Sequence, residues 1–272
     1  MRWPKITVVV PSFNQGQYLA STLASVIEQN YPNLELIVMD GGSTDNSVDI
    51  IKKYESHMTY WSSGPDGGQT AALVDGFARS TGDIQCWLNS DDMQLPHTLK
   101  EVAEYFNVHP EIDTVYGDTI WIDDTGNELR RHREIGFYRF LWMYTYNYLP
   151  GMSTFWRRHI YEAAGGLDSS FNLAMDADLW IRIADVGRIG HVRRFWSKMR
   201  FYPEQKNISL RAQSNEEDLR LRRRYWACDS YPDHYRLKRK LATITRVGLK
   251  VVTGCYGIKY QRDLSKIHKK EK

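Results

Sequence analysis

The sequence predicts an α/β fold in which helices flank a central, mostly parallel sheet, and two observations support this prediction. Short β-branched runs, such as Ile6 to Val10, alternate with segments of helical period, such as Tyr18 to Gln29. This alternation is typical of parallel strands joined by crossover helices. Polar or glycine-rich residues follow each predicted strand, and in parallel sheets such loops form the ligand-binding edge.

The first half of the chain supplies the regular, Rossmann-like part of this sheet. Its predicted strands are the apolar runs Ile6 to Val10, Leu34 to Met39, Met58 to Trp61 and Ile84 to Leu88. Its predicted helices are Tyr18 to Gln29, a segment carrying Val48, Ile51 and Tyr54, and about Thr70 to Arg79. We therefore expect four loops to converge on one edge of the sheet.

The second half is less regular. The stretches TVYGDTIWID and NELRRHRE predict strands, Asp176 to Val186 predicts a helix, and Ile189 to Tyr202 predicts one or two further strands. Two basic helices, roughly 213–227 and 233–253, close the chain. A length of 272 residues suits one large α/β domain with an appendage.

The charge of the chain is unevenly distributed. The net charge is +3, but residues 220–272 hold 16 Lys or Arg against 4 Asp or Glu, which leaves residues 1–219 at −9. Basic tails of this kind bind anionic surfaces, either phospholipid headgroups or nucleic acid. For this chain we expect a membrane surface and no nucleic acid.

The cysteines and the apolar runs indicate the cellular compartment in which the protein is expected. Cys86, Cys228 and Cys255 are odd in number and show no metal-binding spacing, which favours a reducing compartment. No apolar run reaches the roughly 18 residues of a membrane span, and the N-terminal run is too short for a signal peptide. We expect a cytoplasmic protein, either free or held peripherally on the cytoplasmic face of a membrane.

Carboxylates follow the predicted strands. Asp91 and Asp92 come directly after an apolar strand, and two adjacent carboxylates favour water or a cation over a packed interior. Taken alone, NSDD also suits a turn, DGGSTDNS a helix cap, and MDAD a helix start. The convergence of several such motifs on one sheet edge favours a functional site over turn chemistry alone.

Five motifs in order resemble glycosyltransferase family 2, the inverting enzymes with the GT-A fold. They are VVVPSFNQGQYLASTLASVIEQNYPNLELIVMDGGSTDNSVDII, GPDGGQ, GDIQCWLNSDD, FWRRHIYEAAGGLD and MDADLWIR. The resemblance covers about residues 5–205 and is greatest to bacterial members that build surface polysaccharides. It implies a nucleotide-sugar donor, expected to be UDP-linked, an Mg²⁺ or Mn²⁺ ion, and a glycan or lipid-linked glycan acceptor.

The resemblance also implies roles for single residues. Its donor-side matches are Pro11, Ser12, Phe13, Asp40, Gly41, Asp66, Gly68, Asn89, Ser90 and Asp91. Asp91 matches the metal ligand, and Asn89 replaces the first Asp of the commoner DxDD motif. Asp40 and Asp66 match contacts to the base. Tyr202 lies near the position where many relatives have a metal-contacting histidine.

On the acceptor side, Asp176 matches the general base, with Asp178 in reserve. A sugar hydroxyl is a poor nucleophile until a positioned carboxylate accepts its proton. Trp180 and Arg182, on the same predicted helix, are candidates to line the acceptor site. The aromatic segment 137–151 suits either core packing, sugar stacking or a lipid interface.

The resemblance divides the chain at about residue 210. Residues 1–210 form the expected GT-A domain, with a nucleotide-sugar-binding half over about 1–110 and an acceptor-binding half over 111–210. Residues 211–272 form a basic helical C-terminal extension. The implied setting is bacterial surface polysaccharide assembly, such as O-antigen or capsule, at the cytoplasmic face of the inner membrane.

Two other functions stay open from the residues alone. A nucleotidyltransferase would share the strand-end carboxylates, but VPSFNQGQY lacks the Gly-rich, Lys- or Arg-bearing phosphate loop that such enzymes need after the first strand. A non-catalytic module could bind a nucleotide sugar, or use the basic tail to bind nucleic acid. Product analysis and metal dependence separate these alternatives.

Overall fold

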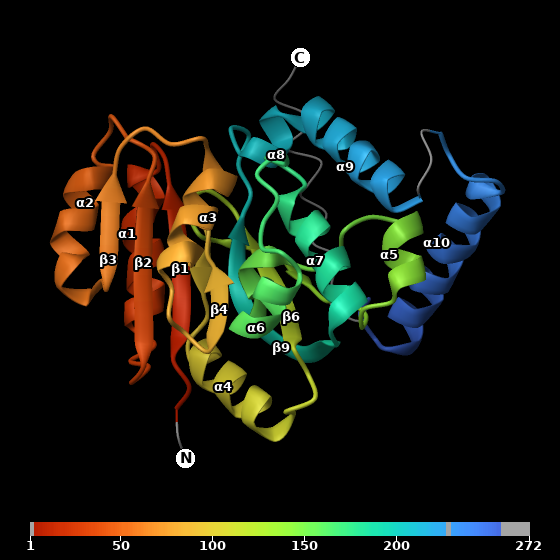
Figure 1. Cartoon of the computed structure of the whole chain (residues 1–272), viewed down its shortest axis with the longest axis horizontal. Coiled ribbons are helices and arrows are strands. Elements are labelled where there is room, and N and C mark those ends of the chain that lie inside the picture. The colour runs from red at the N-terminus through yellow and green to blue at the C-terminus, as the bar shows by residue number, and fades with distance from the viewer. Residues whose placement is uncertain (1–2, 227–229, 257–272) are drawn as a thin grey trace.

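The computed structural model describes residues 3–226 and 230–256, which form a nine-stranded sheet with helices packed around it (Figure 1). The strand order is β3-β2-β1-β4-β8-β6-β9-β5, and β7 pairs with β6. The strands are β1 Ile6–Ser12, β2 Leu34–Asp40, β3 Tyr60–Ser63, β4 Ile84–Trp87, β5 Met93–Gln94, β6 Thr114–Ile122, β7 Glu128–His132, β8 Thr154–Arg157 and β9 Ile189–Arg200.

The helices cover both halves of the chain. They are α1 Gly16–Ile27, α2 Ser47–Tyr54, α3 Gln69–Arg79, α4 Thr98–Val108, α5 Arg139–Tyr144, α6 Arg158–Ala163, α7 Met175–Val186, α8 Lys206–Ser209, α9 Arg211–Trp226 and α10 Tyr235–Val252, with 3-10 turns at Glu55–His57 and Gly151–Ser153. The elements predicted for the first half, for α7 and for the two C-terminal helices are confirmed. Helices α4, α5, α6 and α8 and strands β5 and β8 were not predicted.

Strands β3, β2, β1 and β4 form the parallel part of the sheet, as predicted. Strand β1 pairs in parallel with β2 and β4, so that Val8 lies opposite both Leu36 and Cys86. All seven residues of β1 are buried, which is why this strand is mostly apolar and its polarity does not alternate. Because these strands run in one direction, their carboxyl ends lie at one edge of the sheet.

The second half turns the sheet into a mixed one. Strand β8 runs antiparallel to both β4 and β6, and β9 runs parallel to β6 along nearly its whole length. A single strand, β9, spans most of 189–202, where one or two strands were predicted. Short antiparallel pairings of β5 with β9 and of β7 with β6 complete the sheet.

An aromatic group fills the core between the centre of the sheet and α7. The rings of Trp87 and Trp180 stack with centroids 5.3 Å apart and planes 9° apart, and Trp156 packs against both. Offset stacking of large rings adds specific contacts to the area that they bury. This packing fixes the distance between α7 and the end of β4.

The two C-terminal helices belong to the same packed body. Leu221 of α9 and Ala242 of α10 are buried within the main hydrophobic core, and α10 lies against α5 (Figure 1). Arg222 is buried and donates to the carbonyl of Trp142, so the 220–224 run is not a fully solvated face. The domain division at residue 210 stays a prediction.

Two further predictions concern the thiols and membrane spans. Cys86 and Cys255 are buried free thiols, and Cys228 lies outside the described residues. Within 3–226 and 230–256, no helix combines the length and the apolar character that a membrane crossing requires.

Candidate active site

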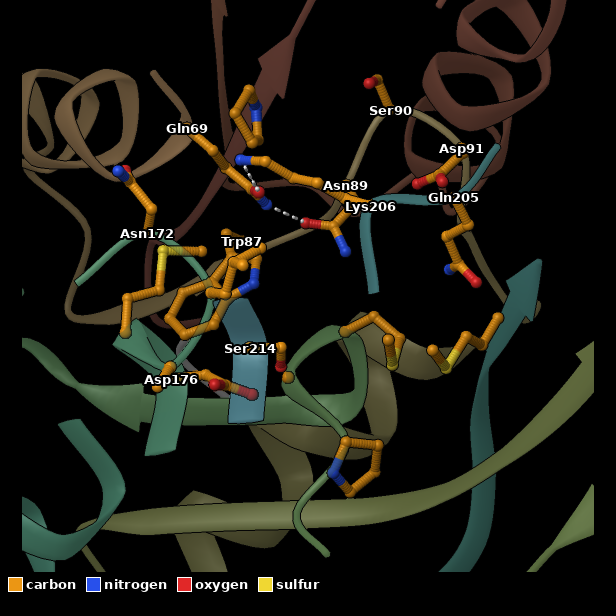
Figure 2. Close-up of a pocket in the computed structure, with 18 of the residues that line it drawn as sticks. Gln69, Trp87, Asn89, Ser90, Asp91, Asn172, Asp176, Gln205, Lys206 and Ser214 are labelled. Carbon is orange, nitrogen blue, oxygen red and sulfur yellow. Dashed lines mark hydrogen bonds between the residues drawn. The ribbon is translucent and has the colours of Figure 1, made fainter. Parts of the chain in front are cut away.

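A cavity of about 1110 Å³ lies at the carboxyl edge of the parallel strands (Figure 2). Loops after the parallel strands form one wall, and segment 146–152 with the start of α7 forms another. Of the predicted site residues, Pro11, Ser12, Phe13, Gly41, Asp66, Gly68, Asn89, Ser90, Asp91 and Asp176 line it. The structure therefore brings together ten of the predicted residues, and leaves Asp40, Asp178, Trp180 and Arg182 outside the lining.

The glycines of the donor-side wall allow two loops to approach each other. A Cβ atom on Gly41 would lie 3.1 Å from Oδ2 of Asp66, which is closer than most real contacts. The amide of Gly68 donates to Oδ1 of Asp66 at 2.7 Å, and Gly68 has a φ of 95°, a conformation that favours glycine. These two glycines hold the Asp66 carboxylate at the cavity wall.

Asp40 lies at the end of β2, as predicted, but it does not line the cavity. Its buried carboxylate accepts hydrogen bonds from the backbone amides of Gly42 and Ser43, and from the hydroxyls of Ser43 and Ser63. These four bonds use its acceptor capacity, so in this structure Asp40 organises the loop after β2. Direct contact with a base through Asp40 finds no support in this arrangement.

The loop after β4 fixes Asn89 and Asp92 in place. The amide nitrogen of Asn89 donates to Asp92 at 3.0 Å, and its oxygen accepts from Gln69 at 2.9 Å. Asp92 is fully buried and also accepts the backbone amide of Arg200 at 3.0 Å. Burial and the neighbouring Asp91 raise the pKa of Asp92 well above its usual value. Asp92 is therefore a structural group of this loop.

Asp91 is the carboxylate of this loop that reaches the cavity. Its Oδ2 accepts the hydroxyl of Tyr202 at 2.8 Å, and Tyr202 lines the cavity beside it. Burial raises the pKa of Asp91, although the hydrogen bond from Tyr202 acts in the opposite direction. A desolvated carboxylate at a cavity wall is stabilised when a cation binds it.

The donor set suits a magnesium or manganese ion held partly by substrate. Among residues 3–226 and 230–256 no group of three or more His, Cys, Asp or Glu could hold a metal ion. Mg²⁺ is commonly bound through one or two carboxylates, with waters and substrate phosphates as the remaining ligands. Asp91 supplies one such carboxylate, so these residues fit an ion that arrives with a diphosphate.

Asp176 lines the cavity from the first turn of α7. Its Oδ2 accepts the side-chain amide of Asn147 at 2.8 Å, and its Oδ1 accepts the backbone amide of Ala177 at 2.7 Å. Burial raises the pKa of Asp176 to about 6. A carboxylate with a pKa near neutrality is a much better proton acceptor than an ordinary aspartate. Figure 2 shows Asp176 set apart from Asn89 and Asp91 within the same cavity.

The acceptor-side predictions further along α7 are not supported by the structure. Trp180 is fully buried against Trp87, and Asp178 is fully buried in ion pairs with Arg182 and Arg224. Only the first turn of α7 reaches the cavity, because the helix then enters the core. Asp178, Trp180 and Arg182 hold α7 in place instead of facing an acceptor.

Sequence reasoning missed several residues that shape the site. Glu217 of α9 accepts the backbone amides of Asn172, Leu173 and Ala174, which lie just before Asp176. Asp218 and Ser214 of α9 line the cavity as well. The predicted extension therefore supplies part of the site wall. No local pattern could have revealed this, since 217 and 172 are distant in sequence.

Aromatic side chains line the end of the cavity away from the β1 loop. Trp121 and His132 stack with centroids 4.7 Å apart, and Tyr146 is 47% exposed. All three line the cavity. Within segment 137–151, Trp142 and Tyr148 are buried in the core, whereas the ring of Tyr146 is partly exposed at the cavity.

The chain is similar to several known proteins. The family model for glycosyl transferase family 2 matches residues 7–165. An uncharacterized glycosyltransferase of Nostoc is 30% identical over 46% of this chain and 41% of its own length. Probable glycosyltransferase YdaM of Bacillus subtilis is 30% identical over 71% of this chain and 49% of its own length. O-antigen biosynthesis protein RfbC of Myxococcus xanthus is 29% identical over 70% of this chain and 15% of its own length. The chain thus spans less than half the length of these relatives.

Solved structures share the fold. S. aureus TarS 1-349 in complex with UDP-GlcNAc superposes with a TM-score of 0.66 at 18% identity, over 86% of this chain and 70% of that one. The mannosyltransferase PcManGT of Pyrobaculum calidifontis, in complex with GDP-Man and Mn²⁺, superposes with a TM-score of 0.63 at 17% identity, over 93% of this chain and 76% of that one. The predicted GT-A fold is confirmed, and since the family model matches more than half of the sequence, this chain belongs to glycosyltransferase family 2.

Proposed function

We propose that this protein transfers a sugar, with inversion, from a nucleotide-sugar donor to a hydroxyl of a glycan or lipid-linked glycan. The observation that carries the proposal is one cavity with two carboxylates of different character. Asp91 lies among the strand-end loops, and Asp176, with its raised pKa, lies at the start of α7. Separate leaving-group and acceptor sites are what a single displacement requires.

The donor would lie along the loops after the parallel strands. Pro11 and the exposed ring of Phe13 offer an apolar surface for the base, Ser12 lines the cavity between them, and Asp66 offers a hydrogen-bond acceptor. A UDP-sugar is the proposed donor, in line with the UDP-GlcNAc bound to the TarS fragment. An Mg²⁺ or Mn²⁺ ion held by Asp91 would neutralise charge on the departing diphosphate.

The acceptor would lie between Asp176 and the aromatic end of the cavity. Its hydroxyl oxygen attacks the anomeric carbon as the bond from that carbon to the diphosphate breaks, and the hydroxyl proton passes to Asp176. The attack on the face opposite the leaving group inverts the anomeric centre. Asn147 orients the carboxylate for this step.

The proposed setting is bacterial surface polysaccharide assembly at the cytoplasmic face of the inner membrane. It is supported by the similarity to an O-antigen biosynthesis protein. The competing nucleotidyltransferase function finds less support, because the β1 loop that lines the cavity through Pro11, Ser12, Phe13 and Gln15 contains no cation. Release of nucleoside diphosphate, and not pyrophosphate, would distinguish sugar transfer.

The test is release of nucleoside diphosphate from UDP-GlcNAc, UDP-glucose and GDP-mannose, with Mn²⁺, with Mg²⁺ and with a chelator. We expect metal-dependent release from one donor. The Asp91→Ala variant should bind the metal about 10- to 100-fold more weakly than the parent. Asp75→Ala, an exposed aspartate on α3, is the matched control and keeps the parent activity. Metal-independent release, or an unchanged Asp91→Ala variant, would contradict the proposal.

The pKa of Asp176 predicts an acid limb in the pH profile. Since the base must be ionised, kcat should fall about tenfold per pH unit below about pH 6. The hydrogen bond from Asn147 lowers this pKa, so Asn147→Ala should move the limb to higher pH. Asn172→Ala, which changes another cavity residue without a hydrogen bond to Asp176, should leave the limb in place. The measurement is kcat against pH for the three proteins.

A further inference from the structure

Helix α10 has its charged and apolar faces reversed relative to an ordinary surface helix. Arg246 and Lys250 are buried, with exposed fractions of 7% and 4%. The opposite face exposes its large apolar side chains, which are Leu237, Leu241, Ile244, Val247, Val251 and Val252. Soluble helices normally bury the apolar stripe and expose the cations.

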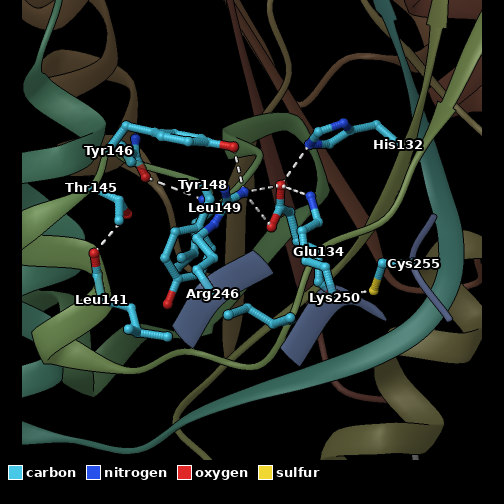
Figure 3. A network of polar contacts seen from close by, with 12 residues as sticks. His132, Glu134, Leu141, Thr145, Tyr146, Tyr148, Leu149, Arg246, Lys250 and Cys255 are labelled. Carbon is cyan, nitrogen blue, oxygen red and sulfur yellow. Dashed lines mark hydrogen bonds and ion pairs between the residues drawn. The ribbon is translucent and has the colours of Figure 1, made fainter. Parts of the chain in front are cut away.

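A buried ionic cluster around Glu134 explains this orientation (Figure 3). Lys250 contacts the Glu134 carboxylate at 2.7 Å, Arg246 at 2.6 Å, and His132 at 2.8 Å. Figure 3 shows these three side chains directed at the carboxylate from two sides. A rotation of α10 that buried its apolar face would withdraw Arg246 and Lys250 and leave the buried carboxylate of Glu134 without their charges, which is unfavourable. The cluster thus holds the apolar stripe outward.

The exposed stripe follows helical spacing. Leu237, Leu241, Ile244 and Val251 lie at steps of four, three and seven residues, and each is between 54% and 65% exposed. A contiguous exposed apolar face of this kind marks an interaction surface. The side chains that lie beside this apolar face indicate which kind of surface it contacts.

Two cations, Arg236 and Lys240, lie on one flank of the stripe, whereas Arg239 lies further around the helix. Arg236, Arg239 and Lys240 line a second cavity, of about 560 Å³, together with Tyr231 and Tyr235. Within the described residues none of these three cations forms an ion pair, and α10 contains no Asp or Glu. Apolar side chains flanked by unpaired cations and tyrosines are typical of helices that lie in the interface of an anionic bilayer.

We propose that α10 binds an anionic phospholipid bilayer, with the stripe of Leu237, Leu241, Ile244 and Val251 among the acyl chains. Arg236 and Lys240 would contact lipid phosphates at the rim. The inner face of the same helix reaches the active site, because Arg246 donates to the hydroxyl of Tyr146, which lines the main cavity. Bilayer docking would therefore bring the acceptor end of that cavity toward a lipid-linked acceptor, a consequence that rests on the proposed function.

The test uses the full chain with vesicles of phosphatidylglycerol and phosphatidylcholine in equal amounts, and with vesicles of phosphatidylcholine alone. We expect co-sedimentation with the anionic vesicles, and weaker binding as salt is raised. Leu241→Glu with Ile244→Glu should lower the partition coefficient by at least about tenfold. Arg236→Gln with Lys240→Gln should lower it by about 30-fold, and only on anionic vesicles.

Matched controls change the same residue types elsewhere on the surface. Val108→Glu with Val186→Glu introduces two carboxylates at exposed apolar positions, and Lys52→Gln with Lys53→Gln removes two exposed cations from α2. Both control variants should bind as the parent does. Thermal unfolding of all variants should match, since every substituted position is exposed.

Three outcomes would overturn the proposal. One is parent-like binding of anionic vesicles by the Leu241→Glu, Ile244→Glu variant, and a second is no vesicle binding by the parent. The third is a parent dimer that this double variant converts to monomer in light scattering, which would make the stripe an interface between copies of the chain. None of these readouts depends on turnover, so failure of the proposed catalytic function would leave vesicle binding unchanged.

Discussion

We expect Asp176→Asn to lower kcat by about 10²- to 10⁴-fold while the KM for the donor stays close to that of the parent. Asparagine keeps the shape of the side chain but cannot accept the proton of the acceptor hydroxyl. The donor-side residues lie on other loops of the cavity, so donor binding should not change. Initial rates against donor concentration at saturating metal give both parameters.

The control for this variant lies on the same helix. Asp185→Asn, near the end of α7, removes an exposed carboxylate that pairs with Arg139 at 2.8 Å. This pair is 44–45% exposed, so its loss should change neither stability nor kcat appreciably. Equal activity of Asp176→Asn and Asp185→Asn would remove Asp176 from the mechanism. A rise in donor KM without a fall in kcat would give it a binding role instead.

The second large effect concerns stability, and its site is Glu134. Replacing Glu134 with Gln leaves Arg246 and Lys250 buried without their counter-charge, and we expect the free energy of unfolding to fall by about 3–5 kcal/mol. Chemical denaturation of parent and variant measures this difference. Glu128→Gln is the control, because its ion pair with Arg131 is about half exposed and contributes at most about 1 kcal/mol.

The same cluster predicts how stability responds to acid. Burial alone would raise the pKa of Glu134, but the hydrogen bond from His132 and the charges of Arg246 and Lys250 lower it from 4.5 to about 2. A carboxylate whose pKa is lower in the folded than in the unfolded state stabilises the folded state. This stabilisation is complete at pH values above the unfolded-state pKa, and it is lost as the pH falls through the folded-state pKa. The parent should therefore lose this stabilisation between about pH 4.5 and pH 2, and Glu134→Gln should lack that part of the acid dependence.

The sequence by itself determined the parallel half of the fold and most of the donor-side wall. Strands such as β1 are fixed by a local property, the β-branched run Ile6 to Val10 followed by turn residues, which is visible without tertiary contacts. Because parallel strands end at one edge, residues placed after them had to converge, and Asp66, Asn89 and Asp91 do line one cavity.

Tertiary structure decided which side chains at that edge stay available. Asp40 and Asp91 both lie at or just after the ends of buried strands. The carboxylate of Asp40 accepts four hydrogen bonds from neighbouring residues, whereas that of Asp91 accepts one, from the hydroxyl of Tyr202, and faces the cavity. Trp180 lies one turn after Asp176, but that turn carries α7 from the cavity into the core against Trp87. Strand ends fix the position of the backbone, and the packing around each side chain fixes its role.

The orientation of the C-terminal helices was decided in the same way. The sequence of α10 carries both an apolar stripe and cations, and its amphipathic pattern alone would bury the stripe. The partner that reverses this preference, Glu134, lies 112 residues before Arg246. The sequence determines local structure because that depends on neighbours along the chain. Which face of a helix is buried depends on charges and cavities that only the folded chain brings together.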